Sequence, residues 1–311
     1  MIRRILSLAI LALPTTAQAF PVTVQSCDRQ VTFAEPPRRA VSNDVNLTEL
    51  MLALGLRDRM AGYTGISGWK TLDERLRADI QQLPELSPRY PGREVLLGAD
   101  ADFYFAGWNY GMNVGGEVTP DTLAPFGIPV YELSESCIHV MEKPKASFED
   151  LFNDARNLGK IFGVPDRAEA LIESWRKDLA AQPATGATRP RVFVYDSGED
   201  APFTAGRYAM PTALIEAAGG VNILEDFAKS WATIGWEEVI ARDPEVILIV
   251  DYGEVTAEQK RDFMVSNPAF ATVTAVREDN FVTLDYVAAT PGPRNIEAVG
   301  ILAEAFARAG E

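Results

Sequence analysis

The chain of 311 residues has few of the side chains on which most enzymes and metal sites depend. It contains one histidine, His139, and two cysteines, Cys27 and Cys137. One histidine cannot supply the several ligands of a typical zinc or bare divalent metal site, and it leaves most acid–base pairs incomplete. Residues 65–68 (GISG) have the wrong spacing for a nucleophile elbow. We therefore expect no catalytic residue, no protein-bound metal and no cofactor, and an α/β enzyme stays the alternative from another class.

Long apolar runs are also scarce. Residues 5–13 form one such run, preceded by Arg3 and Arg4 and followed by Ala17-Gln18-Ala19. This order is typical of a secretory signal peptide. The run is too short to cross a bilayer, and no later segment approaches the ~20 apolar residues that a span needs. We expect cleavage after Ala19 and, because no cysteine follows directly, a soluble periplasmic protein without a lipid anchor.

Basic residues are outnumbered, with 29 Lys and Arg against 44 Asp and Glu and a formal net charge of −15. Loss of Arg3 and Arg4 with the signal peptide removes two positive charges and takes the net charge to −17. Acidity on this scale argues against a nucleic acid or an anionic membrane as the partner.

The two cysteines favour a disulfide. In an oxidising compartment a lone pair such as Cys27 and Cys137 is expected to be joined. The bond would close a loop of about 110 residues, which on the chain-entropy model stabilises the fold by up to about 4 to 5 kcal/mol. A cysteine nucleophile or metal ligand is the alternative.

The clearest pattern that is present is a repeat. Residues 94–105 align without a gap with residues 237–248. In each copy a short helix ends at an acidic turn and an apolar run follows; in the second copy Pro244 biases Asp243 out of the helix. Such a run suits an interior strand of a parallel sheet. The repeat predicts two equivalent α/β lobes with a cleft, and the alternative is a chance likeness of two α/β stretches.

Strands alternate with helices along the rest of the chain, which predicts a parallel, doubly wound sheet in each lobe. A hairpin is expected over residues 22–33, and strands over 40–42, 60–63, 129–131, 191–195, 245–250 and 281–284. Helices are expected over residues 47–54, 71–80, 120–126, 147–161, 165–181 and 296–309.

The halves are joined by helices. Ser147 and Asp150 resemble a capping box, and Pro165 opens a helix that would span on the order of 25 Å. A helix of that length can act as a stiff strut and permits only a small hinge motion. The predicted division is a signal peptide over residues 1–19, a first lobe over 20–146, connecting helices and linker over 147–189, and a second lobe over 190–311.

Aromatic residues gather in loops at strand ends, where ligands of doubly wound sheets bind. They are Trp69, Trp108, Tyr110, Tyr208, Trp231 and Tyr286. Flat aromatic walls suit a bulky, partly apolar ligand, although each ring could instead pack between or over the lobes. Arg207 and Arg294 are the expected anchors for a carboxylate or phosphate, the alternative being surface ion pairs. His139 is expected to be structural.

Several short motifs recur in a fixed order over nearly the whole mature chain. They are residues 36–41 (PPRRAV), 46–50 (NLTEL), 53–55 (ALG), 158–168, 202–206 (PFTAG), 218–223 (AGGVNI), 231–237, 243–244 (DP) and 292–294 (GPR). In this order they resemble the periplasmic substrate-binding proteins for ferric siderophores, haem and vitamin B12 that serve ABC importers.

The resemblance implies two Rossmann-like lobes with parallel-rich sheets, joined by a long rigid helix, with the ligand between them and little closure on binding. It implies a binding function without chemistry, and we expect a ferric siderophore as the ligand. The alternatives are a corrinoid, haem or an organic cofactor precursor, because the pair Cys27 and Cys137 is untypical of the best-known members.

The resemblance also implies a partner. In the family one glutamate on each lobe pairs with arginines of the dimeric permease in the inner membrane, and the matching positions here are Glu49 and Glu237. Two separated carboxylates would fix orientation and speed encounter. The alternative for each is a solvated charge at a helix start. We expect the binding protein itself to be a monomer.

Overall fold

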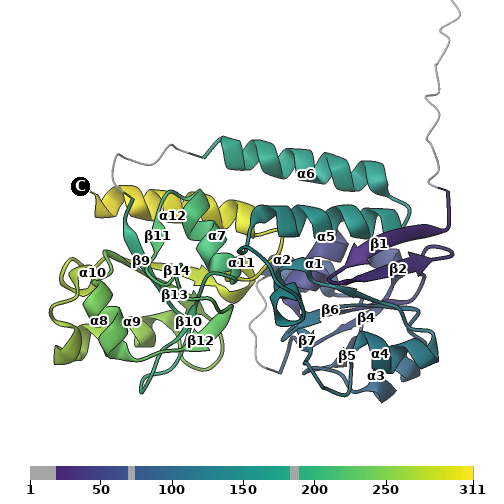
Figure 1. The fold of residues 1–311 in the computed structure, drawn as a ribbon, viewed down its shortest axis with the longest axis horizontal. Coiled ribbons are helices and arrows are strands. Elements are labelled where there is room, and N and C mark those ends of the chain that lie inside the picture. The colour runs from purple at the N-terminus through teal and green to yellow at the C-terminus, as the bar shows by residue number, and fades with distance from the viewer. Residues whose placement is uncertain (1–18, 69–73, 183–188, 311) are drawn as a thin grey trace, which may run out of the picture.

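Two α/β lobes lie side by side in the computed structural model, which describes residues 19–68, 74–182 and 189–310 (Figure 1). Residues 1–18 of the predicted signal peptide and Trp69 lie outside the described residues, as do residues 183–188 of the linker before the second lobe. Within the described ranges, no helix is both long and apolar enough to cross a membrane.

The first lobe is built on a sheet in which every pair of neighbouring strands is parallel. The strands follow the order β5-β4-β3-β6-β7, and β8 also pairs with β6. Their bounds are β3 (Ala40–Asn43), β4 (Met60–Thr64), β5 (Glu85–Ser87), β6 (Phe103–Trp108), β7 (Gly111–Met112) and β8 (Val130–Glu132). The helical segments are α1 (Val45–Ala53), η1 (Arg57–Arg59), α2 (Glu74–Ile80), α3 (Arg93–Gly98), α4 (Pro120–Leu123), η2 (Ala124–Phe126) and η3 (Ser134–His139).

A separate antiparallel hairpin, β1 (Val22–Ser26) with β2 (Arg29–Phe33), precedes this sheet as the sequence predicts. The disulfide is present: Cys27 in the hairpin turn is bonded to Cys137 in η3. The bond joins the edge of the lobe to the segment that follows β8.

The second lobe repeats the design with a parallel sheet of order β11-β9-β13-β14. Its strands are β9 (Arg191–Tyr195), β11 (Val221–Asn222), β13 (Val246–Asp251) and β14 (Phe281–Asp285), with β10 (Phe203–Ala205) and β12 (Trp231–Thr233) forming an antiparallel pair. The helical segments are α7 (Met210–Ala217), α8 (Trp236–Arg242), α9 (Ala257–Ser266), η4 (Pro268–Phe270), α10 (Thr274–Arg277), α11 (Tyr286–Ala289) and α12 (Asn295–Ala309).

The internal repeat extends beyond the segment that the sequence aligned. Strands β4-β3-β6-β8 of the first lobe have the same parallel order as β11-β9-β13-β14 of the second. The aligned segments are α3 with β6 and α8 with β13. The predicted fold class, two lobes with parallel-rich sheets joined by helices, is therefore confirmed.

The turn between helix and strand is the same in both lobes. Asp100 and Asp243 both take a left-handed backbone, with φ of 48° and 42°. An arginine holds this turn in each lobe. Arg39, just before β3, donates from its guanidinium to the carbonyl of Asp100, and Arg191, the first residue of β9, donates to the carbonyl of Asp243. Each hydrogen bond satisfies a carbonyl left open at a helix end.

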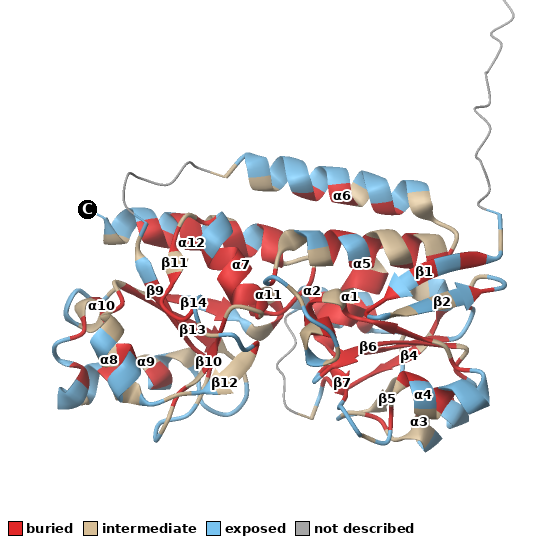
Figure 2. Ribbon diagram, viewed as in Figure 1, coloured by how far each residue is buried: buried red, intermediate tan, exposed pale blue. Residues whose placement is uncertain are grey.

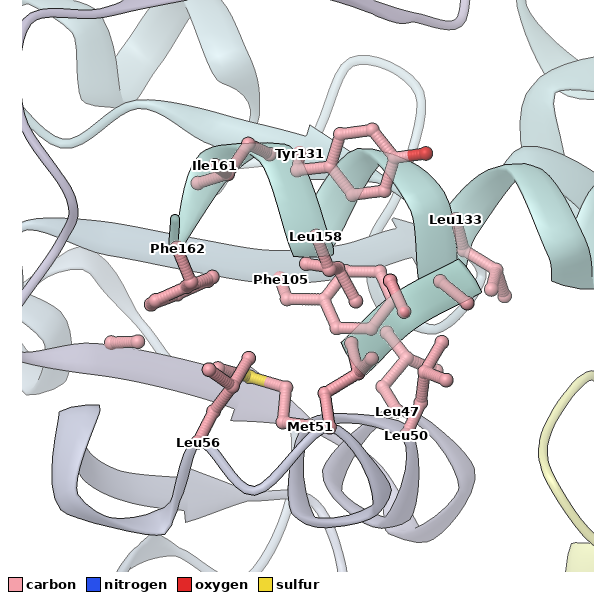
Figure 3. Close-up of a cluster of buried hydrophobic side chains, with 14 of the residues drawn as sticks. Leu47, Leu50, Met51, Leu56, Phe105, Tyr131, Leu133, Leu158, Ile161 and Phe162 are labelled. Atoms are coloured by element: carbon pink, nitrogen blue, oxygen red, sulfur yellow. The ribbon is translucent and has the colours of Figure 1, made fainter. Parts of the chain in front are cut away.

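Both faces of each sheet are covered, as expected for parallel strands. In β6, Phe103 and Phe105 face the cluster that includes α1 and α5 (Phe148–Ile161), while Tyr104 faces the cluster with Leu96 of α3. Figure 3 shows Leu47, Leu50 and Met51 of α1 opposite Leu158 and Phe162, with Phe105 between them. Figure 2 shows the same layering, with buried strands and helices exposed on their outer sides.

Helices α5 and α6 (Pro165–Ala180) connect the lobes (Figure 1). The backbone N–H of Ser147 donates to the Asp150 carboxylate at 3.2 Å, as the capping box predicts. The α6 residues Ile172 and Trp175 are buried in the first lobe's core, and Leu179 packs against the cores of both lobes. The strut is thus fixed to each lobe by apolar contacts.

Helix α1 begins earlier than expected. The sequence placed its start near Leu47, whereas the helix starts at Val45 with Asp44 as the N-cap. The Asp44 carboxylate accepts the backbone N–H of Val45 at 2.6 Å, and Asp44 has a φ of 72°. The cap places a buried carboxylate at the carboxyl end of β3.

Candidate functional site

A cavity of about 360 Å³ lies between the two lobes, at the carboxyl ends of their central strands. The first lobe contributes Tyr90, Asn109, Tyr110 and His139, and the second lobe contributes Asp196, Phe203, Ser230, Trp231, Val250, Tyr252, Tyr286 and Thr290. This is the edge at which parallel sheets bind ligands, because loops diverge there. The volume is within the range of small-molecule sites.

Phe, Trp and Tyr make up half of the residues that line the cavity. Phe203 and Trp231 are stacked with ring centroids 5.7 Å apart and an angle of 19° between their planes. Tyr252 and Tyr286 pack with centroids 5.3 Å apart. These pairs come from neighbouring parts of the second lobe, so the rings support one another and present flat apolar surfaces.

Two tyrosine hydroxyls of the wall are held by buried carboxylates. The Tyr252 hydroxyl donates to Asp196 Oδ2 at 2.6 Å, and the Tyr286 hydroxyl donates to Asp44 Oδ2 at 2.9 Å. The second bond crosses from the second lobe to the first. Burial is the main cause that raises the pKa of both tyrosines, so both phenols stay protonated at neutral pH.

The first lobe adds a polar rim. Asn109 Nδ2 and His139 Nε2 lie 3.1 Å apart, and the Tyr90 hydroxyl donates to the backbone carbonyl of Asn109. Asn109 has a φ of 66°, which turns the chain sharply after β6. His139 is therefore part of the site's edge and has a hydrogen-bond partner there.

Three of the predicted ligand-binding residues line this cavity: Tyr110, Trp231 and Tyr286. Trp69 lies outside the described residues. The structure places the remaining four predicted residues elsewhere. Trp108 is buried and its indole N–H donates to Glu132 at 2.9 Å, so the ring packs inside the first lobe.

Arg207 and Tyr208 lie between β10 and α7, and Arg207 donates to the backbone carbonyl of Glu225 at 2.9 Å beside a separate hollow. Arg294 forms an ion pair with Glu49 of the first lobe, with Nε to Oε1 at 2.8 Å. Their side chains are only 16 % and 12 % exposed. Both Arg294 and Glu49 thus lie at the lobe interface, away from the cavity.

The sequence reasoning missed Asp196, Tyr252, Phe203, Tyr90 and Asn109. The sequence correspondence between the two lobes relates some of these residues to each other. Residues 39–44 (RAVSND) and 191–196 (RVFVYD) occupy equivalent strands, so Asp196 corresponds to Asp44. The offset of the longer repeat likewise pairs Asn109 with Tyr252. Extending the repeat to the residues after each strand would have found these positions.

The glutamates expected to dock differ in their surroundings. Glu237 is exposed in the first turn of α8, whereas Glu49 is mostly covered beside Arg294. The repeat partner of Glu237 is Glu94, which is exposed in the first turn of α3. Both carboxylates fold over the glycine that precedes the helix, since a Cβ added at Gly92 or Gly235 would lie 3.0 or 2.7 Å from them.

The described residues contain no group of three or more His, Cys, Asp and Glu side chains placed to hold a metal ion. The cavity offers aromatic faces, hydroxyls and one carboxylate of its own. Such a lining can enclose an organic ligand or a complete metal chelate.

A profile of the family described as "Periplasmic binding protein" matches residues 119–288, more than half of the chain. The chain therefore belongs to this family, whose members serve ABC importers. A solved periplasmic binding protein from Veillonella parvula is 30 % identical, with a TM-score of 0.79 over 93 % of this chain and 98 % of that one.

Two further relatives are similar over most of the chain. The structure of an ABC-type Fe³⁺-hydroxamate transport system from Saccharomonospora viridis is 24 % identical, with a TM-score of 0.78 over 93 % of this chain and 99 % of that one. A cobalamin-binding protein of Halobacterium salinarum is 26 % identical over 93 % of this chain and 75 % of its own length. These relatives are named as binding or transport proteins, which agrees with a transport role and a location outside the cytoplasm.

Proposed function

We propose that the protein captures a ferric siderophore in the cavity between its lobes and delivers it to the permease of an ABC importer. One observation carries the proposal: aromatic rings from both lobes converge on one cavity at the carboxyl ends of the sheets. Flat rings around a single chamber suit a bulky, partly apolar molecule that is held without being transformed.

The lining favours a chelate whose metal centre carries no net negative charge. No lysine or arginine occurs among the described residues of the cavity wall. A ferric tris-catecholate carries three negative charges, and the described lining offers no lysine or arginine to balance them. Three hydroxamates, each with one negative charge, balance Fe³⁺, so a ferric trihydroxamate is the favoured class of siderophore.

Calorimetric titration of the mature protein tests the ligand class. We expect a ferric trihydroxamate to bind with a Kd below about 1 μM and a ferric tris-catecholate to bind at least 100-fold more weakly. The free hydroxamate without iron serves as the matched control. Tight binding of the catecholate alone would contradict the trihydroxamate class, and binding of neither complex would contradict the siderophore assignment.

A corrinoid is the second candidate, favoured by the name of the Halobacterium salinarum relative and its coverage of 93 % of this chain. Cyanocobalamin has no net charge and presents a broad apolar face, so it also meets the demands of an uncharged aromatic wall. The same titration distinguishes the two, because only one of the two ligands should bind below the micromolar range.

Docking on the permease is assigned here to Glu94 and Glu237. The two carboxylates occupy equivalent first-turn positions, one on each lobe, and both are exposed. Glu49, the other position suggested by the family motifs, is 12 % exposed and forms an ion pair with Arg294. An equivalent pair of charges matches a partner built from two like subunits.

Substitution separates docking from ligand binding. The variant Glu94→Ala with Glu237→Ala should keep the ligand affinity of the wild type and lose uptake in cells whose own binding protein is deleted. Glu238→Ala, next to Glu237 and also exposed, is the matched control and should retain uptake. Normal uptake with the double variant would remove the docking assignment.

A further inference from the structure

The second lobe places an accessible carboxylate oxygen in the cavity wall. Asp196 follows β9 directly and is 4 % exposed. Both hydroxyl donors, Tyr252 at 2.6 Å and Ser197 at 2.9 Å, bond to its Oδ2. Within the described part of the chain Oδ1 receives no hydrogen bond, and it is not among the unpartnered atoms that are sealed from solvent. Oδ1 is therefore the acceptor that a ligand can reach.

Aromatic rings surround this carboxylate. Phe203 pairs with Ser197 in a β-bridge beside Asp196, and its ring is stacked on Trp231. The ring of Tyr252 is held at Asp196 by its own hydroxyl. The negative faces of such rings attract cations, most strongly where water is excluded.

The described lining contains one carboxylic acid side chain and no lysine or arginine. That acid is Asp196. The surrounding protein lowers the pKa of His139, so its ring is neutral at pH 7. The chain as a whole carries a net charge of −15, which steers cations toward it.

Lys260 supports Asp196 from behind the wall. It is 3 % exposed, its Nζ donates to the backbone carbonyl of Val250 at 2.5 Å, and it lies 5.0 Å from the centroid of the Tyr252 ring. Burial raises the pKa of Asp196, while the hydroxyls of Tyr252 and Ser197 and the charge of Lys260 oppose this rise. Lys260, which is not among the residues lining the cavity, thus acts against the rise in the pKa of Asp196.

We propose that the Asp196 side of the cavity is a subsite for a protonated amine of the ligand. Oδ1 accepts an ammonium N–H, and the rings of Phe203, Trp231 and Tyr252 lie around the charge. The inference rests on the proposed function for the rest of the ligand, which is then a chelate with an uncharged metal core and an arm that ends in an ammonium group.

Small probes test the subsite without any chelate. Benzylammonium and benzyl alcohol have similar size and share an aromatic ring, but only the first carries a charge. Their affinities are measured by calorimetry on the mature protein at pH 7. We expect the wild type to bind benzylammonium about tenfold more tightly than the alcohol, as a hydrogen bond and a cation–π contact together imply.

The Asp196→Asn variant keeps the shape of the side chain and should lower this ratio to about one. Asp200→Asn removes the same charge from an exposed position four residues away and should keep the tenfold preference. Equal binding of the two probes by the wild type, no measurable binding of benzylammonium, or an unchanged ratio in Asp196→Asn would each overturn the subsite.

A pair of ferric trihydroxamates then links the subsite to the cargo. One ends in a free amine and the other in its N-acetyl derivative. If the wild type prefers the amine-ended complex and Asp196→Asn does not, both the subsite and the siderophore assignment are supported. If neither complex binds while benzylammonium does, the siderophore assignment fails and the cation subsite stands.

Discussion

Tyr252 and Tyr286 set the geometry of the cavity through their hydroxyl groups. Each hydroxyl donates to a buried carboxylate, Asp196 or Asp44, and these carboxylates end equivalent strands of the two lobes. A buried carboxylate requires donors, and a phenol supplies one while keeping its ring in the cavity. Protein groups alone thereby hold the rings in one orientation, which lowers the entropic cost of binding.

Trp231 and Trp108 provide a direct comparison between a cavity residue and a core residue. We expect Trp231→Ala to weaken ligand binding about tenfold or more, because the ligand loses a flat apolar wall. Trp108→Ala should lower the urea midpoint while the folded variant keeps its ligand affinity, since this ring packs in the first lobe's core. Calorimetry and urea titration measure the two effects. Equal losses of affinity in both variants would contradict the placement.

Glu135 makes stability depend on pH. It is buried at the lobe interface, where it accepts the backbone N–H of Met210 at 3.2 Å, and burial raises its pKa from 4.5 to about 8. Between these values the folded state holds a proton that the unfolded state has released, so the free energy of unfolding falls as pH rises from about 5 to 8. Asp154, with a pKa raised by burial to about 7, acts in the same direction.

The Glu135→Gln variant isolates this contribution. Glutamine keeps an acceptor for Met210 and cannot ionise, so the variant should lose part of the fall in urea midpoint between pH 5 and pH 8. Wild type and variant are compared at both values in the same buffer. An identical fall in both proteins would show that Glu135 does not ionise in this range.

At the scale of elements, η3 links the disulfide, the interface and the cavity. It contains Cys137, which is joined to Cys27 of the hairpin, together with Glu135 and His139. Fixing one short segment at the hairpin therefore positions an interlobe contact and the rim of the site at once. Short helical segments depend on such tertiary contacts because they have little stability of their own.

Removal of the disulfide tests this link. The variant Cys27→Ser with Cys137→Ser should lose about 2 to 4 kcal/mol of unfolding free energy, because the unfolded chain regains the freedom of a long loop. It should also bind ligand more weakly, because η3 is released. Wild type treated with a reductant is the control in the same urea titration. An unchanged midpoint and affinity would contradict a structural role of the bond.

At the scale of the whole molecule, polar contacts join the two lobes directly. The interlobe bonds include Tyr286 to Asp44, the Arg294 pair with Glu49, and Asn46 Nδ2 to the carbonyl of Pro291 at 2.7 Å. Helix α6 packs on both lobes as well. A large hinge opening would break these bonds and expose buried polar groups, which is costly.

We therefore expect ligand binding to leave the radius of gyration unchanged within experimental error in small-angle X-ray scattering. The variant Arg294→Met with Glu49→Gln removes one interlobe ion pair and serves as the comparison, with a larger radius than the wild type. A clear contraction of the wild type on adding ligand would show that the lobes close like a hinge.

The sequence alone determined the alternation of strands and helices, the two lobes and the disulfide pairing. These follow from local rules: apolar runs of strand length, proline and glycine at helix ends, and a lone cysteine pair. The repeat of residues 94–105 in residues 237–248 also predicted the equivalence of β6 and β13 and the acidic turn before each strand. The left-handed backbone of Asp100 and Asp243 in that turn came only from the structure. Tyr110, Trp231 and Tyr286, which line the cavity, were predicted as site residues because ligand loops follow strand ends.

Only the tertiary structure decided which of the candidate side chains share the cavity. Trp108 packs in a core, where its indole N–H bonds to Glu132. Arg294 pairs with Glu49, which lies 245 residues away in the sequence. Asp196 became part of the site through its position at the end of β9 and the hydroxyl of Tyr252, 56 residues later in the sequence. Local pattern predicts that a residue lies near a strand end, but burial, charge and partners depend on how the two lobes pack together.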